Sequence, residues 1–231
     1  MPFPMPRSAT LIILISLEAF SAAWGQTWKT LPGCRMVEGE YADGDSFNVK
    51  QGGKDYVFRL YFCDTPETDK RFPDRVRTQA KYFGITQKNI IAAGKEAQAF
   101  TQSILSVPFT VITKWEDARG ESHQERFYAI VLIGQKNLAE LLVSAGWARS
   151  YGMLADYPTE RQGKAFRGQL DKTEASAKES KKGAWGLKTS KSPSTKTKTV
   201  KKTAPPPPTS AEDRLDQQMS SGIDPILKNS Q

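Results

Sequence analysis

Histidine and cysteine are scarce in this chain of 231 residues, and their scarcity narrows the chemistry that it can support. There is one histidine, His123, and there are two cysteines, Cys34 and Cys63. A zinc site with four Cys or His ligands therefore cannot form within one chain. A general base that pairs one histidine with another is also excluded. Any catalysis must rest on carboxylates, cationic side chains and, where a metal takes part, a hard cation.

The chain also lacks an apolar run long enough to cross a bilayer. Residues 9–20 are largely apolar, but this stretch is shorter than the ~20 residues that a membrane-spanning helix needs. Arg7 precedes it, and Ala23-Trp24-Gly25 follows with small residues where a signal peptidase reads. The pattern predicts a signal peptide over 1–25 and a secreted, periplasmic or envelope protein with no membrane span after its removal. The alternative is an uncleaved anchor.

Acidic residues are fewer than basic ones, with 25 Asp and Glu against 33 Lys and Arg and a net charge of +8. This excess favours a polyanionic partner such as nucleic acid. Residues 188–231 are rich in Lys, Ser, Thr and Pro and carry half of the excess. Such a composition cannot bury a core, so it predicts a disordered tail, either a solvated tether or a nucleic-acid-binding arm. The remaining residues, 26–187, suffice for one domain.

A strand that ends in a charged turn is the most informative stretch of that domain. Arg59 lies midway along apolar alternation, and Pro66 must end the strand between Asp64 and Glu67. In a regular strand, Asp64 would point away from Arg59. We therefore expect a bulge or sharp bend near Cys63-Asp64, a device often found beside active sites.

Asp45 is expected to reach this strand end across a hairpin. Gly52-Gly53 is typical of a tight turn and separates strands predicted at 46–50 and 55–63. Centring the turn on the two glycines places Asp45 opposite Leu60 or Arg59. Asp45 and Arg59 are therefore expected to be neighbours in the fold.

The remaining elements follow from periodicity and turn residues. Further strands are predicted at 34–42, 109–115 and 126–133, with a short extended segment at 147–151, and helices at 94–105, 137–146 and 159–182. Residues 68–91 are polar and basic and predict an exposed excursion with some helix. Cys34 and Cys63 both fall on predicted strands. They pair as a disulfide if those strands are neighbours, and buried free thiols are the equal alternative.

Asp45 and Asp64 form an oxygen-only pair suited to Ca²⁺ or another hard cation. Asp43 either contributes to that pair or only forms the turn. Glu67 lies three residues beyond Asp64, close enough to act on a water as general base.

Arg59 and Arg126 supply planar donor forks that match phosphate oxygens. A cation, a base and two guanidiniums are the ingredients for attack on a phosphodiester. The alternative is a surface network of salt bridges between Arg59 and Asp64 or Glu67. Such a network would stabilise by only about 0–1 kcal/mol per exposed pair.

The order and spacing of these motifs resemble the thermonuclease family, of which staphylococcal nuclease is the best known member. The resemblance covers roughly residues 33–187. Its motifs are Asp43-Gly44-Asp45-Ser46-Phe47, Phe58-Arg59-Leu60, Asp64-Thr65-Pro66-Glu67, Gly94-Lys95-Glu96-Ala97 with Phe100, Arg126-Phe127-Tyr128-Ala129 and Leu142-Val143-Ser144-Ala145-Gly146-Trp147-Ala148.

The resemblance implies an α+β fold, mainly β, with a five-stranded OB-fold barrel and about three packed helices. It further implies a monomeric hydrolase, a Ca²⁺-dependent endonuclease or exonuclease that cleaves DNA and RNA to 3′-phosphate ends with low sequence specificity. By position, the implied metal ligands are Asp45, Asp64 and the carbonyl of Thr65. The implied catalytic residues are Arg59, Glu67 and Arg126.

Three departures bear on function. The loop over 68–93 is longer than in the best known member, and Ser46 replaces a frequent threonine. Gln124-Glu125 stands where the family has Tyr-Gly, so a tyrosine near the nucleotide is missing. The rival hypotheses are a nucleic-acid-binding OB-fold module that does not cleave and a secreted structural protein tethered by its tail.

Overall fold

The computed structural model of the chain describes residues 27–39, 42–120, 124–158 and 162–187. The signal peptide predicted at 1–25 and the tail predicted at 188–231 lie outside these ranges. Within the described ranges, no helix combines the length and the apolar character that a membrane span requires.

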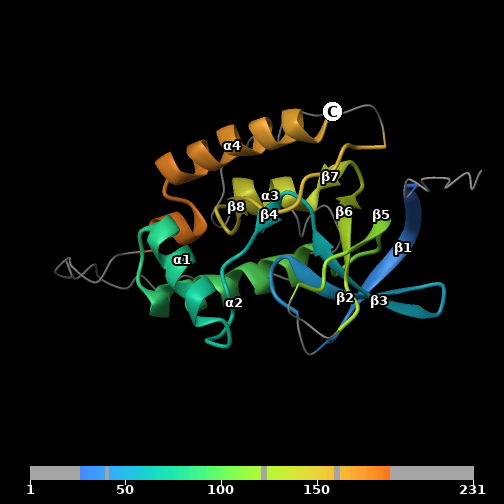
Figure 1. Ribbon diagram of the computed structural model, residues 1–231, viewed down its shortest axis with the longest axis horizontal. Helices are drawn as coiled ribbons and strands as arrows, with labels where there is room; N and C mark the ends of the chain where they lie inside the picture. Colours follow the sequence, from blue (N-terminus) through green and yellow to red (C-terminus); the bar gives the residue numbers. More distant parts are fainter. Residues whose placement is uncertain (1–26, 40–41, 121–123, 159–161, 188–231) are drawn as a thin grey trace, which may run out of the picture.

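Five strands close into a barrel (Figure 1). The strands are β1 (Lys29–Val37), β2 (Ser46–Gln51), β3 (Lys54–Leu60), β5 (Phe109–Asp117) and β6 (Phe127–Ile133). The parallel pairing of β3 with β6, in which Phe58 lies opposite Phe127, closes the barrel. The other four pairings around it are antiparallel. The predicted five-stranded barrel is therefore confirmed.

The β2–β3 hairpin has the predicted register. Gly52 and Gly53 adopt φ angles of 57° and 80°, which the tight turn requires and which glycine adopts without strain. Ser46 lies opposite Arg59, and the Leu60 amide donates to the Asp45 carbonyl at 2.8 Å. Asp45 therefore lies at the end of β2, beside the strand that carries Arg59.

The predicted bend of the charged strand is also present, one residue earlier than the expected position. Strand β3 ends at Leu60, and Phe62 has a φ of 72°, which is rare for a residue with a bulky side chain. The chain then resumes as β4 (Cys63–Asp64), which pairs with β8 (Arg149–Ser150) in a separate two-stranded sheet. This break turns Asp64 toward Arg59.

Four α-helices occur in the described residues: α1 (Pro73–Phe83), α2 (Gln87–Ile104), α3 (Leu138–Ser144) and α4 (Gly163–Glu179). A 3-10 turn, η1 (Gly183–Gly186), and the two-residue strand β7 (Lys136–Asn137) complete the elements. In Figure 1, α4 runs above α3 and β8, and α1 lies on the opposite side of the molecule from the barrel strands. Asn137 caps α3 as predicted, because its side chain accepts from the Ala139 amide at 2.8 Å.

Helix α2 begins at Gln87, earlier than the predicted Gly94. The Thr86 hydroxyl accepts from the Asn89 amide and so caps the helix start. Gly94 therefore lies inside a helix, where glycine costs about 1 kcal/mol relative to alanine unless close packing demands it.

Helix α1 confirms that the segment 68–91 contains helix, but one face of this helix is buried and not exposed as expected. Val76, Ala80 and Phe83 form one buried face of the helix and pack in a cluster with Ile90 and Ala184. Their spacing of three or four residues is that of a helix face. The polar composition of 68–91 concealed these few apolar positions. They make α1 a fixed part of the domain.

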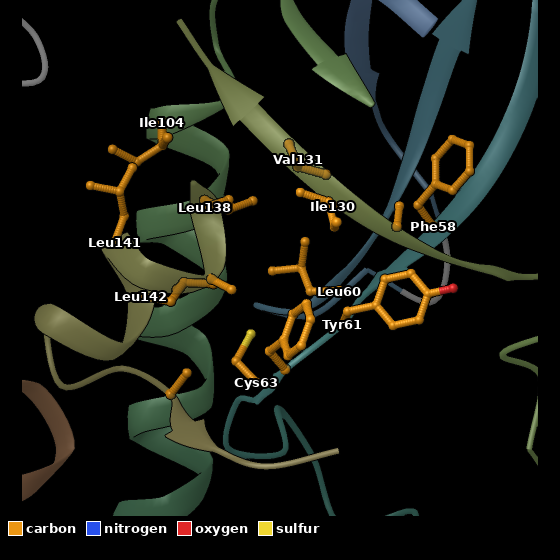
Figure 2. Packing of buried hydrophobic residues seen from close by; sticks show 14 of the residues in the cluster. Phe58, Leu60, Tyr61, Cys63, Ile104, Ile130, Val131, Leu138, Leu141 and Leu142 are labelled. Carbon is orange, nitrogen blue, oxygen red and sulfur yellow. The ribbon is translucent and has the colours of Figure 1, made fainter. Parts of the chain in front are cut away.

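The main core joins the barrel to α3 (Figure 2). Leu60 from β3 and Ile130 from β6 lie in one cluster with Leu138 and Leu142. Full burial of a leucine contributes about 1.5–3 kcal/mol, so this cluster holds the end of β3 firmly. The charged turn that follows β3 is thereby attached to the hydrophobic core.

Cys34 and Cys63 are both free thiols buried in this core. The sequence allowed either a disulfide or two buried free thiols, and the structure contains the free thiols. Burial raises the pKa of the Cys63 thiol well above its usual range. The thiolate is thus disfavoured, which leaves Cys63 a packing residue.

Candidate active site

The turn before β2, which carries Asp45 into the site, is closed by the side chain of Asp43. Asp43 accepts hydrogen bonds from the amides of Asp45 and Ser46, at 3.0 Å and 2.7 Å, and so closes the turn with its side chain. Burial, and then the neighbouring Asp45, raises the pKa of Asp43 well above its usual range. The Asp43 carboxylate thus forms the turn, which is one of the two roles predicted for it.

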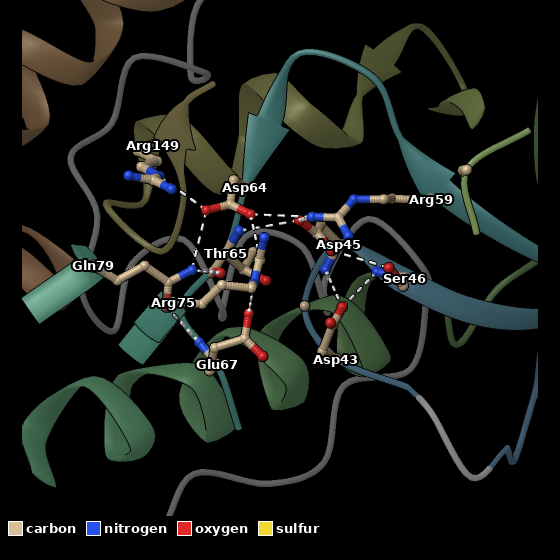
Figure 3. A network of polar contacts seen from close by, with 12 residues as sticks. Asp43, Asp45, Ser46, Arg59, Asp64, Thr65, Glu67, Arg75, Gln79 and Arg149 are labelled. Carbon is tan, nitrogen blue, oxygen red and sulfur yellow. Dashed lines mark hydrogen bonds and ion pairs between the residues drawn. The ribbon is translucent and has the colours of Figure 1, made fainter. Parts of the chain in front are cut away.

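Arg59 joins the two carboxylates predicted from the sequence (Figure 3). Its Nη2 lies 3.3 Å from Asp45 Oδ2 and 3.1 Å from Asp64 Oδ1, so two carboxylate oxygens converge on one nitrogen. Asp45 also raises the pKa of Arg59, which keeps the guanidinium charged. The hairpin and the break after β3 thus bring together residues that lie apart in sequence.

Asp64 is the most heavily contacted group of the site. Its Oδ1 accepts from Arg59 and from Arg75 Nη2 at 2.9 Å, and its Oδ2 accepts from Arg149 Nε at 2.8 Å and Gln79 Nε2 at 3.0 Å. Burial alone would raise the pKa of Asp64, but Arg75, Arg149 and Arg59 together lower it. A buried carboxylate remains ionised only with such partners.

Gln79 holds the turn that follows Asp64. Its side-chain amide donates to the Thr65 carbonyl at 2.9 Å, and its oxygen accepts from the Glu67 amide at 2.9 Å. The Gln79 side chain is fully buried. The Thr65 amide in turn donates to Asp45 Oδ2 at 3.2 Å. Both sides of the turn are therefore tied, one to α1 and the other to the β2 end.

Glu67 lies at the end of this turn, under α1. Its Oε1 accepts from Arg75 Nε at 2.6 Å, and its side chain is 12% exposed. Burial raises the pKa of Glu67, Arg75 opposes this rise, and Asp45 and Asp64 add to it. A raised carboxyl pKa moves a group closer to the range in which it exchanges protons near neutral pH.

Arg126 approaches from the segment before β6. Its Nε donates to the Ala118 carbonyl at 2.9 Å, and its Nη1 donates to the Ser46 hydroxyl at 3.3 Å. The same hydroxyl donates to Asp45 Oδ1 at 3.1 Å, so Ser46 connects Arg126 to the carboxylates. Burial and the nearby Arg59 lower the pKa of Arg126. An anion between the two guanidiniums would relieve that repulsion.

A family model described as staphylococcal nuclease homologue matches residues 57–186, more than half of the chain. The chain belongs to that family. The match includes Arg59, Asp64, Glu67 and Arg126, whereas Asp45 precedes it and joins the site through the hairpin. No curated protein matched the chain. The domain is thus a nuclease-type OB-fold, and its family is the one that the sequence motifs resemble.

All six residues predicted for the site of this nuclease-type domain lie in one hydrogen-bonded network. Asp45, Arg59, Asp64, Thr65 and Glu67 are linked directly or through one side chain, and Arg126 is linked through Ser46.

Sequence reasoning missed Arg75, Gln79 and Arg149. The first two lie four residues apart on α1, and a helix started by Pro73 would have placed them on one face. Arg149 reaches Asp64 because β8 pairs with β4, a contact between segments more than 80 residues apart that no local pattern indicates.

An aromatic stack borders this nuclease-type site. The Arg149 guanidinium lies 4.1 Å from the centre of the Tyr151 ring and 5.1 Å from that of Tyr82. Tyr82 donates to the buried carboxylate of Glu174, which also accepts from the Ser150 amide. The stack joins α1, β8 and α4 on one side of Asp64.

Proposed function

We propose that this protein is an exported, Ca²⁺-dependent nuclease that hydrolyses DNA and RNA with low sequence specificity and leaves 3′-phosphate ends. The single observation that carries this proposal is the Arg59 guanidinium between Asp45 and Asp64, with Glu67 on the adjoining turn. A surface salt-bridge network does not explain it, because both aspartates are almost fully buried.

The donor set suits calcium in its chemistry. Two carboxylates, Asp45 and Asp64, and the Thr65 carbonyl are oxygen ligands of the kind that Ca²⁺ prefers. Among the described residues, no group of three or more Asp, Glu, His or Cys side chains is arranged as a metal site. A bound ion would therefore take its remaining ligands from water or substrate. Its contribution would be to neutralise charge on the phosphate oxygens.

Three residues of the chain then take different roles in hydrolysis. Glu67 accepts the proton of the attacking water, whose oxygen forms a bond to phosphorus. Arg59 and Arg126 donate to the nonbridging oxygens, where negative charge increases in the transition state. The P–O5′ bond breaks and the departing 5′ oxygen takes up a proton from a solvent water, so the phosphate remains on the 3′ end.

The sequence and the family support the proposed substrate, location and assembly. The net charge of +8 favours polyanionic DNA and RNA. The apolar run at 9–20, followed by small residues, supports export to the periplasm, envelope or medium. We propose that the protein acts as a monomer, because Asp45, Arg59, Glu67 and Arg126 all come from one chain.

One observation favours the second candidate, a nucleic-acid-binding module that does not cleave. The Glu67 carboxylate is engaged by Arg75, which hinders a general base unless the pair opens. Such a module would bind DNA independently of Ca²⁺ and would leave the strand intact. Its affinity for DNA would decrease steeply with salt concentration.

The deciding experiment is digestion of single- and double-stranded DNA and RNA by the full chain, with Ca²⁺ and with a chelator, followed by analysis of product lengths and ends. We expect short products with 3′-phosphates only when Ca²⁺ is present. Intact substrates in both conditions would refute the hydrolase and support the binding module.

A further inference from the structure

Helix α1 directs one polar face toward the charged turn. Arg75, Gln79 and Tyr82 are spaced by four and three residues, as on one side of a helix. Their contacts fall in the same order: Arg75 with Glu67 and Asp64, Gln79 with the Thr65 turn, and Tyr82 with Arg149 and Glu174. The predicted loop insertion is thus a helix that forms one side of the site.

The backbone of α1 is firmly held at this position. Val76, Ala80 and Phe83 pack in the second hydrophobic cluster on one side of the helix, and the fully buried Gln79 anchors the other. Arg75 therefore starts from a fixed point beside Glu67. Only its side chain is able to move without unpacking the helix.

Three guanidiniums contact Asp64, and they differ in exposure. The side chains of Arg59 and Arg149 are 18% and 8% exposed, whereas that of Arg75 is 42% exposed. Water and salt compete for the Arg75 guanidinium because its side chain is half exposed, although its partners Asp64 and Glu67 are largely buried. Arg75 is therefore the cation of this site that is most readily transferred to another anion.

We infer that Arg75 binds a phosphate of the substrate nucleic acid and releases Glu67 as it does so. This inference rests on the proposed function. A guanidinium binds phosphate oxygens through the same donor fork that now contacts Glu67 and Asp64. The exchange uncovers the Glu67 carboxylate as the strand enters. Arg75 thus adds a third phosphate-binding guanidinium to Arg59 and Arg126.

The test compares Arg75→Ala with Arg77→Ala, its matched control on the same helix. Arg77 pairs with Asp74, and its side chain is 64% exposed. The kcat/KM for a single-stranded DNA is measured with saturating Ca²⁺ from about 50 to 200 mM salt. Removing one phosphate contact reduces the slope of log kcat/KM against log salt by about 0.7. We expect this reduction, together with a roughly 10–100-fold loss of kcat/KM, for Arg75→Ala only.

Arg75→Lys separates charge from geometry. We expect the parent's salt slope, because the charge remains, together with a reduced rate, because the donor fork is lost. An Arg75→Ala variant with the parent's salt slope would overturn the inference, whether its rate falls or rises, because Arg75 would then act on Glu67 alone.

The role of Arg75 can be tested even if the proposed hydrolysis is wrong. If the parent chain binds DNA without cleaving it, the same salt slopes measured on Kd still test Arg75. A slope about 0.7 lower for Arg75→Ala supports phosphate contact, and an equal slope excludes it.

Discussion

Gly94 of α2 lies directly against the backbone of Glu67. A β-carbon at Gly94 would come within 2.2 Å of the Glu67 carbonyl oxygen and 2.6 Å of that of Pro66. No side chain fits at such distances, so the glycine allows α2 to support the turn from below. The position of the predicted general base therefore depends on a residue that carries no functional group.

Gly94→Ala is expected to push this turn away from the other site residues. We expect a loss of about 1–3 kcal/mol in the free energy of unfolding, since the β-carbon meets rigid backbone. The rate of DNA cleavage should fall as Glu67 moves. The control is Gly168→Ala in α4, where a β-carbon meets nothing within 4 Å. That change should stabilise the fold by about 0.5–1 kcal/mol and leave cleavage unaltered. Urea unfolding and initial rates measure both effects, and equal stability changes would contradict the packing argument.

Gln79→Leu removes the amide that ties α1 to the turn. The Thr65 carbonyl and the Glu67 amide would lose their partner within a buried site. Each buried unpaired group costs about 1–3 kcal/mol, so we expect a total loss of about 2–6 kcal/mol for the two groups. The loosened turn should reduce kcat roughly 10–100-fold. The matched control is Gln102→Leu, at an exposed position of α2. A Gln79 variant as stable and as active as this control would show that the amide is dispensable.

Arg126→Ala tests the guanidinium of the residue directly before β6. If Arg126 donates to the phosphate in the transition state, kcat should fall by about 10³–10⁵, as for an arginine finger. The free energy of unfolding should change far less. Arg126 donates to a carbonyl and a hydroxyl oxygen, and water can donate to both once the side chain is absent. Arg35→Ala, an exposed arginine at the end of β1, controls for the loss of one positive charge. A decrease below tenfold would remove Arg126 from the mechanism.

Asp45→Asn tests the calcium proposal. The neutral amide weakens an oxygen site for a divalent cation, so half-maximal activity should require at least about tenfold more Ca²⁺. A chelator should abolish cleavage by the parent, and added Ca²⁺ should restore it. Asp55→Asn serves as the control, because that carboxylate is 69% exposed and pairs only with Lys50 among the salt bridges of the described residues. An unchanged Ca²⁺ dependence of the Asp45 variant would exclude this carboxylate as a ligand.

The hairpin shows why part of the site was predictable. The register of β2 and β3 follows from the paired glycines at 52 and 53, a local feature that sets every opposing pair up to Asp45 and Leu60. The bend before Asp64 was predictable for a similar reason. In a strand with strict alternation, the Asp64 carboxylate would point away from Arg59. A break in the strand is therefore needed, and it occurs at Phe62, whose φ is positive.

The α1 side of the site was not predictable by the same means. The contacts of Arg75 and Gln79 depend on how a helix packs, and its three apolar residues are sparse within a polar segment. The start of α2 was predicted too late, at Gly94, because glycine is more common at a helix boundary than inside a helix. Here the glycine is required by the Glu67 carbonyl, a contact that only the packed structure contains.

The sequence by itself determined the hairpin register, through its local turn, and the family, through its motifs. The barrel and the six candidate site residues were predicted from the resemblance to that family. The tertiary structure alone decided that Arg75, Gln79 and Arg149 complete the network, and that Cys34 and Cys63 remain free thiols. These contacts arise between segments whose distance in space is set by core packing. That distance is a property of the whole fold and not of any single stretch of the chain.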